Sequence, residues 1–157
     1  MQRIGIEEGR RAFGADAANY DSARPDYPER VFEVIRDRCG SMVGLDAFEI
    51  GAGTGLATRR LLQLGVRLQV HDPEAMANVR AIYGAKLTYA ELPMDALDGA
   101  DALAIVTEWG EFRNPEFDEM KSRMRQPVVF DGRNLYNPRQ MKSLGFTYHC
   151  IGKTPVQ

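Results

Sequence analysis

Apolar runs of strand length alternate with amphipathic runs of helical length along most of this 157-residue sequence. This alternation is typical of a parallel sheet with helices on both faces, because parallel neighbours must be joined by a long crossover. We expect six strands, and right-handed crossovers then predict a doubly wound sheet with an order near 3-2-1-4-5-6. The expected fold class is therefore α/β, with a mostly or wholly parallel sheet in a three-layer domain.

Glycine and proline residues set the boundaries of these expected elements. A helix should begin after Pro28, end near Cys39, and bury Val31, Phe32, Val34 and Ile35. The other expected helices cover 56–64, 74–83, 115–124 and 138–144. The expected strands cover 45–50, 67–71, 86–89, 102–107, 127–131 and 146–151. Nothing in the composition divides the chain, so we expect one Rossmann-like domain over 1–157, with 1–20 as a flexible tail or a flap.

The composition excludes several classes of function. The formal net charge is −2 and the two signs are interspersed, which gives no support to binding of nucleic acid or of an anionic membrane. Cys39 and Cys150, the two cysteines, do not stand at metal-ligand spacing, so we expect free thiols and no metal site. The N-terminus has no apolar core of the kind found in a signal peptide. We expect a cytoplasmic, soluble protein whose self-association stays open.

The turn after the first expected strand carries the clearest sign of chemistry. Gly51, Gly53 and Gly55 allow a sharp backbone turn and close approach to a ligand, and the next helix presents unpaired N–H groups there. Asp72 follows Gly51 by 21 residues, close to the ~20 at which an acidic side chain reaches ribose hydroxyls. A glycine turn without a ligand is the alternative. In combination, these residues predict a nucleoside site.

The spacing G-x-G-x-G, preceded by Glu49, differs from a dinucleotide fingerprint, which requires Gly or Ala where Leu56 stands. Together with the segment "YDSARPDYPERVFEVI", it resembles the start of a class I S-adenosylmethionine-dependent methyltransferase over residues ~13–65. The resemblance implies S-adenosylmethionine as cofactor. It assigns residues to the cofactor as follows: Glu49, Gly51, Ala52, Gly53 and Gly55 in the loop, Asp72 at the ribose, and Tyr20 and Arg24 in a flap. A surface turn around Pro25 is the alternative for Tyr20 and Arg24.

From Gly65 onward the resemblance changes. The segments "GVRLQVHDPEAMANVRAIYG", "DGADALAIVTEWGEF" and "PVVFDGRNLYNPRQMKSLGFTYHCIGK" resemble the C-terminal, UDP-binding domain of UDP-glucose 6-dehydrogenases over ~65–153. This resemblance implies a UDP-sugar site formed by residues 107–109 and 131–134, and Glu108 and Arg133 are its candidate remnants. An arginine at a strand end suits a phosphate, whereas an ion pair to Glu108 or Asp131 is the structural alternative, which we favour.

Neither resemblance covers a whole enzyme. The NAD domain, the nucleophilic cysteine and the lysine that the second family implies have no counterpart here, and the first family's acceptor segments are replaced. We expect a chimera of two Rossmann-like folds, engineered or otherwise a natural fusion, that switches family near 65–76. It should hold S-adenosylmethionine or S-adenosylhomocysteine, with no catalytic residue assigned and little or no turnover. A domain with vestigial sites, a weak UDP-sugar binder and an active methyltransferase are the alternatives.

The remaining polar and sulfur-containing candidates are assigned to structure. His71 is expected as a solvated or hydrogen-bonded structural residue, His149 is a still weaker candidate for catalysis, and Glu91 is expected as an exposed loop carboxylate. Trp109 should pack instead of stacking on a base. The methionines of the helical segments, Met94, Met120, Met124 and Met141, are expected to fill the core.

Overall fold

A single parallel sheet of six strands organises the molecule, which we describe from a computed structural model covering residues 26–108 and 110–156. The strand order is β3-β2-β1-β4-β5-β6, so the predicted order is confirmed. The strands are β1 Asp46–Ile50, β2 Arg67–His71, β3 Thr88–Tyr89, β4 Ala102–Ile105, β5 Val128–Asp131 and β6 Thr147–Cys150. All five strand pairs are parallel.

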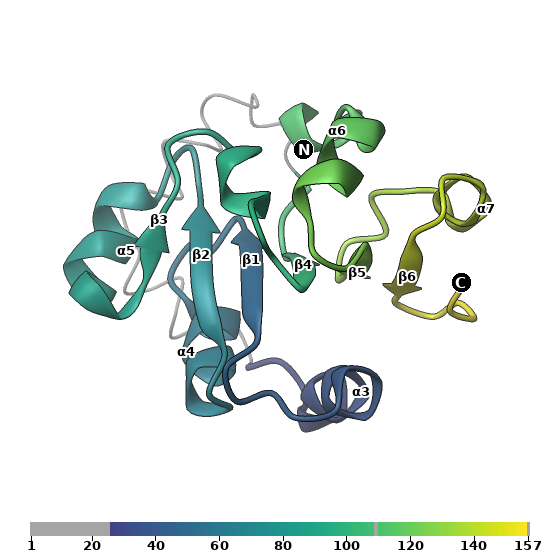
Figure 1. The fold of residues 1–157 in the computed structure, drawn as a ribbon. Coiled ribbons are helices and arrows are strands. Elements are labelled where there is room, and N and C mark those ends of the chain that lie inside the picture. The colour runs from purple at the N-terminus through teal and green to yellow at the C-terminus, as the bar shows by residue number, and fades with distance from the viewer. Residues whose placement is uncertain (1–25, 109, 157) are drawn as a thin grey trace, which may run out of the picture.

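Helices cover both faces of this sheet. They are α3 Glu29–Cys39, α4 Leu56–Gln63, α5 Met76–Tyr83, α6 Phe117–Arg123 and α7 Pro138–Ser143, with short 3-10 turns η1 Gly84–Lys86, η2 Asp95–Leu97 and η3 Gly110–Phe112. Figure 1 shows α5 beyond the short β3 at one end of the sheet and α7 beside β6 at the other. The three-layer α/β class is therefore confirmed.

The alternation of side chains along the strands produces two separate cores. Phe48 and Ile50 of β1 face α6, α7 and η2, in a cluster that includes Met120, Met141 and Tyr148. The opposite face packs against α3, α4 and α5. Both faces are apolar because each is covered, as expected for a parallel sheet.

Several boundaries differ from the sequence prediction. The strand expected at 86–89 is reduced to two residues, because η1 uses residues 84–86 as a turn. The strand expected at 102–107 ends at Ile105, and the helix expected at 74–83 begins at Met76. Val31 was expected on the buried side of α3 but is 36% exposed, since Phe32 is the residue of this helix that faces the core.

The two edge strands are protected in different ways. The edge at β3 is only two residues long. At the other edge, the chain after β6 turns back, and Val156 forms an antiparallel bridge to Tyr148 with N···O distances of 2.8 and 3.0 Å. Short or covered edges limit edge-to-edge pairing between copies.

Candidate functional site

The loops that follow β1, β4 and β5 meet at the carboxyl end of the sheet. The strand order reverses between β1 and β4, and ligands of open α/β sheets bind outside the strand ends at such a switch point. The loops after β1 and β4 are packed together, since a Cβ on Gly51 would lie 2.3 Å from the Cβ of Thr107. The sequence-predicted nucleoside loop and the segment containing Glu108 are therefore direct neighbours.

The glycine loop adopts the backbone conformations that the sequence predicted. Gly51, Gly53 and Gly55 have φ values of +77°, +57° and +85°, all in the left-handed region. Gly55 is covered, because the Tyr83 hydroxyl donates to its carbonyl oxygen at 2.9 Å. At Gly53 the loop is more open, because an added Cβ would meet only the Gly51 carbonyl oxygen, at 3.8 Å. Ala52 is buried in the core on the α4 face.

Glu49 lies on β1 beneath this loop and is completely buried. Its Oε2 accepts a hydrogen bond from the Thr58 hydroxyl of α4 at 2.7 Å, and its Oε1 has no hydrogen-bond partner. Burial raises the pKa of Glu49 to about 7, opposed by the hydrogen bond from Thr58. Glu49 is therefore a proton-binding group inside the core, directly below the predicted ligand loop.

Asp72 follows β2 and links the glycine loop to α5. Its Oδ2 accepts from the Gly53 amide at 2.9 Å, and its Oδ1 accepts from the amides of Glu74 and Ala75, both at 2.9 Å. The side chain is 4% exposed. The structure thus brings Asp72 to the glycine loop, as the spacing predicted, but shows it in backbone hydrogen bonds; its contact with a ribose stays a prediction.

Arg133 extends from the loop after β5 and contacts Glu108 of the loop after β4. Its Nη2 lies 2.7 Å from Glu108 Oε1, and the two side chains are 36% and 62% exposed. The ion pair that the sequence offered as the structural alternative for Arg133 is confirmed. In this ion pair the Arg133 guanidinium remains at the protein surface, at the carboxyl end of the sheet.

The loop that carries Arg133 folds around the buried carboxylate of Asp131. Asp131 accepts from the amides of Arg133 at 2.9 Å, Leu135 at 2.7 Å and Tyr136 at 3.2 Å, and from the Tyr148 hydroxyl at 2.7 Å. Asn134 is left-handed, with φ +55°, and its side-chain amide donates to the Ile151 carbonyl.

Other expectations are settled by burial and hydrogen bonding. His71 is buried with Nδ1 3.0 Å from the Ala90 carbonyl oxygen, and Glu91 is exposed, so their structural assignments are confirmed. His149 is buried with Nδ1 unpartnered, stacked on Phe130, and desolvation lowers its pKa. The methionines are confirmed as core residues: Met120, Met124 and Met141 are buried, and Met94 packs against them partly buried.

Part of the predicted site lies outside the described residues, namely Tyr20, Arg24 and Trp109. Conversely, sequence reasoning missed three contacting residues: Thr58, Tyr83 and Tyr148. Thr58 comes three residues after Gly55, where a helix side chain can turn back toward the strand. No signal in the sequence distinguishes Tyr83 or Tyr148 from an ordinary core tyrosine.

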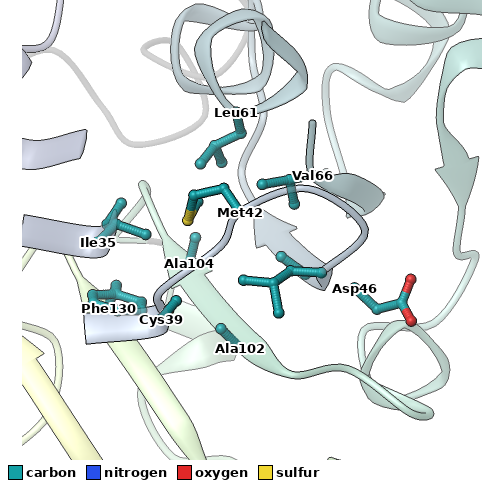
Figure 2. A pocket seen from close by; sticks show the side chains of 11 residues that line it. Ile35, Cys39, Met42, Asp46, Leu61, Val66, Ala102, Ala104 and Phe130 are labelled. Atoms are coloured by element: carbon teal, nitrogen blue, oxygen red, sulfur yellow. The ribbon is translucent and has the colours of Figure 1, made fainter. Parts of the chain in front are cut away.

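An apolar cavity of about 20 Å³ lies between α3 and the sheet. Figure 2 shows Ile35, Met42 and Phe130 around it, with the Asp46 carboxylate directed away. It has room for about one water and offers that water no polar partner, so we assign it to packing. Within 26–108 and 110–156, no group of three or more His, Cys, Asp or Glu could hold a metal ion, and no helix could cross a membrane. Cys39 and Cys150 are free.

Comparison with known proteins supports the second of the two resemblances, that to the UDP-binding domain of UDP-glucose dehydrogenases. Residues 56–138 match the family model described as the UDP-glucose/GDP-mannose dehydrogenase family, UDP binding domain. The UDP-glucose 6-dehydrogenase of Pseudomonas aeruginosa is 49% identical over 98 residues, which are 59% of this chain and 22% of that protein. The corresponding enzyme of Rhizobium meliloti is 42% identical over 93 residues, 59% of this chain and 21% of that protein. The chain thus spans about a fifth of the length of these relatives.

Solved structures agree with this assignment. A UDP-glucose dehydrogenase from the hyperthermophilic archaeon Pyrobaculum islandicum superposes with a TM-score of 0.60 at 29% identity, covering 72% of this chain and 27% of that chain. L-tryptophan dehydrogenase from Nostoc punctiforme covers 96% of this chain and 47% of its own, at a TM-score of 0.56 and 19% identity, which shows the fold alone. The chain belongs to the UDP-glucose/GDP-mannose dehydrogenase family, whose UDP-binding domain it contains.

Proposed function

We propose that this domain binds a UDP-sugar at the carboxyl end of β4 and β5, with Arg133 contacting the diphosphate. The observation that carries the proposal is the surface position of the Arg133 guanidinium, opposite Glu108, in a domain that belongs to a UDP-binding family. The relatives it matches are named UDP-glucose 6-dehydrogenases. The proposal is for binding, and no residue is assigned to catalysis.

The electrostatics of this pair favour exchange with a ligand. An ion pair between two substantially exposed side chains contributes only ~0–1 kcal/mol, so its loss costs little. The contact uses Nη2 alone, whereas a guanidinium can donate two parallel hydrogen bonds to a phosphate. A diphosphate can therefore replace Glu108 as the partner of Arg133 at low cost.

The first test is a thermal-shift titration of the whole chain with UDP-glucose, UDP, S-adenosylmethionine, S-adenosylhomocysteine and NAD in parallel. A ligand that binds only the folded state stabilises it by about 2.7 kcal/mol at a hundredfold excess over its Kd. We expect stabilisation by UDP-glucose and UDP. No response to either ligand would contradict the proposal.

Two arginine variants show whether a response arises at this site. Arg133→Ala should weaken UDP binding about 10- to 100-fold, because a hydrogen bond to a charged group contributes ~1.5–3 kcal/mol. Arg139→Ala is the matched control, since Arg139 is also exposed and lies six residues further along the chain, on α7. Equal losses of UDP affinity in the two variants would mean that the nucleotide binds at another site.

A second candidate function is binding of S-adenosylmethionine or S-adenosylhomocysteine at the glycine loop, with little or no turnover. It is supported by the left-handed conformations of Gly51, Gly53 and Gly55 and by the open side of Gly53. Against it, both oxygens of Asp72 accept backbone amides, and Tyr83 covers Gly55. The ligand would have to add its ribose to the existing hydrogen bonds of Asp72.

Gly53→Asn tests this candidate without disrupting the turn. Asn tolerates a left-handed φ, and its side chain would enter the open space through which a nucleoside must approach. Gly152→Asn is the control, because Gly152 also has a positive φ, of +72°, and open surroundings but lies beyond β6. Stabilisation by S-adenosylhomocysteine that is lost only in Gly53→Asn would support the candidate, and stabilisation unaffected by Gly53→Asn would contradict it.

The origin of residues ~13–65 in a methyltransferase, and hence a chimera with a family switch near 65–76, is also a proposal. The family match includes only residues 56–65 of that segment. Asp72 accepts amides from both parts, Gly53 before the switch and Ala75 at its end, which supports a join that preserves the strand and turn geometry.

A further inference from the structure

The loop that carries Arg133 is held by a contact between two neighbouring strands. Asp131 is the last residue of β5 and is 2% exposed. Tyr148 stands on β6 opposite Val129, with its side chain on the same face of the sheet as Asp131. A tyrosine two residues back from the strand end is long enough to place its hydroxyl beside that carboxylate, since two strand residues span about 6.6 Å.

The hydroxyl of Tyr148 is directed to this carboxylate. It lies 2.7 Å from Asp131 Oδ2 and 3.1 Å from the carbonyl oxygen of Tyr136. A phenol has one proton to donate, and the shorter contact to a charged acceptor is the stronger. Burial and the carboxylate beside it raise the pKa of Tyr148, so the hydroxyl remains a donor at physiological pH.

The same carboxylate fixes the backbone at Arg133 and in the residues just after it. Its Oδ1 accepts the Arg133 amide, and its Oδ2 accepts the amides of Leu135 and Tyr136. The loop is also anchored to β4, because the Gly132 amide donates to the Ile105 carbonyl oxygen at 2.9 Å. Asp131 therefore fixes the backbone from which the Arg133 side chain extends.

We infer that Tyr148 and Asp131 are positioning residues, which hold residues 131–136 so that the Arg133 guanidinium is presented at the carboxyl end of the sheet. The inference rests on the proposed binding of a diphosphate by Arg133. Loss of the Tyr148 hydroxyl removes one of the four hydrogen bonds that hold the Asp131 carboxylate, so this carboxylate holds residues 131–136 less tightly. The loop then samples conformations in which Arg133 points away from the phosphate.

Tyr148→Phe tests the inference, and the chain offers a matched control in Tyr136→Phe. Tyr136 is also buried, and its hydroxyl donates to the Phe112 carbonyl oxygen at 2.8 Å, away from Asp131. Each variant loses one buried hydroxyl, so we expect similar decreases in Tm, of about 3–6 °C. Only Tyr148→Phe should lower the affinity for UDP, by about fivefold, whereas its affinity for uridine should stay within about twofold of the parent.

Amide hydrogen exchange provides a second readout that needs no ligand. In Tyr148→Phe the amides of Arg133, Leu135 and Tyr136 should exchange about tenfold faster than in the parent, while Tyr136→Phe leaves the amides of Arg133 and Leu135 unchanged. Equal exchange in both variants, or equal loss of UDP affinity, would overturn the positioning role. If the parent itself fails to bind UDP, the proposed function fails, together with the ligand-directed part of this inference. The exchange data would still decide whether Tyr148 holds the loop.

Discussion

Glu49 shows how a single buried acid can make stability depend on pH. Its carboxyl group is inaccessible to solvent, one of its oxygens has no partner, and burial raises its pKa from 4.5 to about 7. A raised pKa means that the folded state binds the proton more tightly than the unfolded state. The stabilisation of the fold by this proton on Glu49 is therefore complete below about pH 4.5 and is lost as the pH rises through about 7.

Glu49→Gln should remove this dependence. The amide resembles the neutral acid in shape, so the variant should match the parent in stability near pH 4.5. Above pH 7 it should exceed the parent by up to about 3 kcal/mol, because each pKa unit corresponds to ~1.4 kcal/mol. Urea unfolding at pH 5 and pH 8 measures the difference, with Glu91→Gln as an exposed control. A constant difference between variant and parent at the two pH values would contradict the raised pKa.

Substitution of Glu108 should affect ligand binding in the opposite direction to substitution of Arg133. Its carboxylate forms an ion pair with the Arg133 guanidinium that we assign to the diphosphate, and its negative charge repels a phosphate. Glu108→Gln should therefore tighten UDP binding by about three- to fivefold, in line with the ~1 kcal/mol upper value of an exposed ion pair. Calorimetric titration with UDP measures this. A weaker affinity would instead make Glu108 a contact of the ligand.

Among the elements, α5 is preceded by a turn whose backbone amides are held by Asp72, a residue outside the helix. The helix has no side-chain cap of its own, and Asp72 accepts the amides of Glu74 and Ala75 just before it. Asp72→Ala would leave three backbone donors without their acceptor and should destabilise the fold by about 3 kcal/mol.

Chemical denaturation of Asp72→Ala, Asp72→Asn and Asp118→Ala checks this prediction. Asn retains one acceptor oxygen and should fall between the parent and the alanine variant. Asp118 lies exposed in the first turn of α6 and should be near neutral. A small effect of Asp72→Ala on the free energy of unfolding would mean that Asp72 does not stabilise the fold, and would leave ligand binding as its role.

The periodicity of the sequence was sufficient to predict the elements and their order. β2 begins and ends where expected, because its apolar run is bounded by Gly65 and by the turn at Asp72. β3 was predicted too long, since the sequence does not reveal that residues 84–86 form a turn. Edge strands are short for reasons of neighbouring packing, which periodicity does not record.

The candidate site was predictable in its residues but not in its hydrogen bonds. Parallel strands bring their carboxyl ends together, so Asp72 and Arg133 could be placed at one edge from the strand pattern alone. Which groups they contact depends on loop backbones: three amides at Asp72, and a loop organised by Asp131 at Arg133. Such contacts arise from the φ and ψ angles of a few residues, which leave no periodic signal.

At the scale of the whole molecule, charged residues at the amino end of the sheet link Asp46, which precedes the proposed family switch, to residues that follow Gly65. Asp46 of β1 accepts two hydrogen bonds from Arg67 of β2, at 2.6 and 2.8 Å. Arg125, which precedes β5, contacts both Asp46 at 3.3 Å and Asp101 at 2.6 Å. The hydrogen bond from Arg67 is the main cause that lowers the pKa of Asp46. One group of ion pairs therefore links β1 and β2 to the segments that lead into β4 and β5 at this end of the sheet.

The covered edge at β6 yields a prediction about self-association. Val156 exchanges two backbone hydrogen bonds with Tyr148 and thereby occupies the outer edge of the last strand. Val156→Pro removes the N–H of this bridge and should release the segment, which leaves the β6 edge open to a second copy. Val156→Thr retains the N–H and the β-branched shape and is the control. We expect a concentration-dependent dimer for Val156→Pro alone in analytical ultracentrifugation. An equally monomeric Val156→Pro would mean that the bridge does not protect this edge, and equal dimerisation of all three proteins would place the contact elsewhere on the surface.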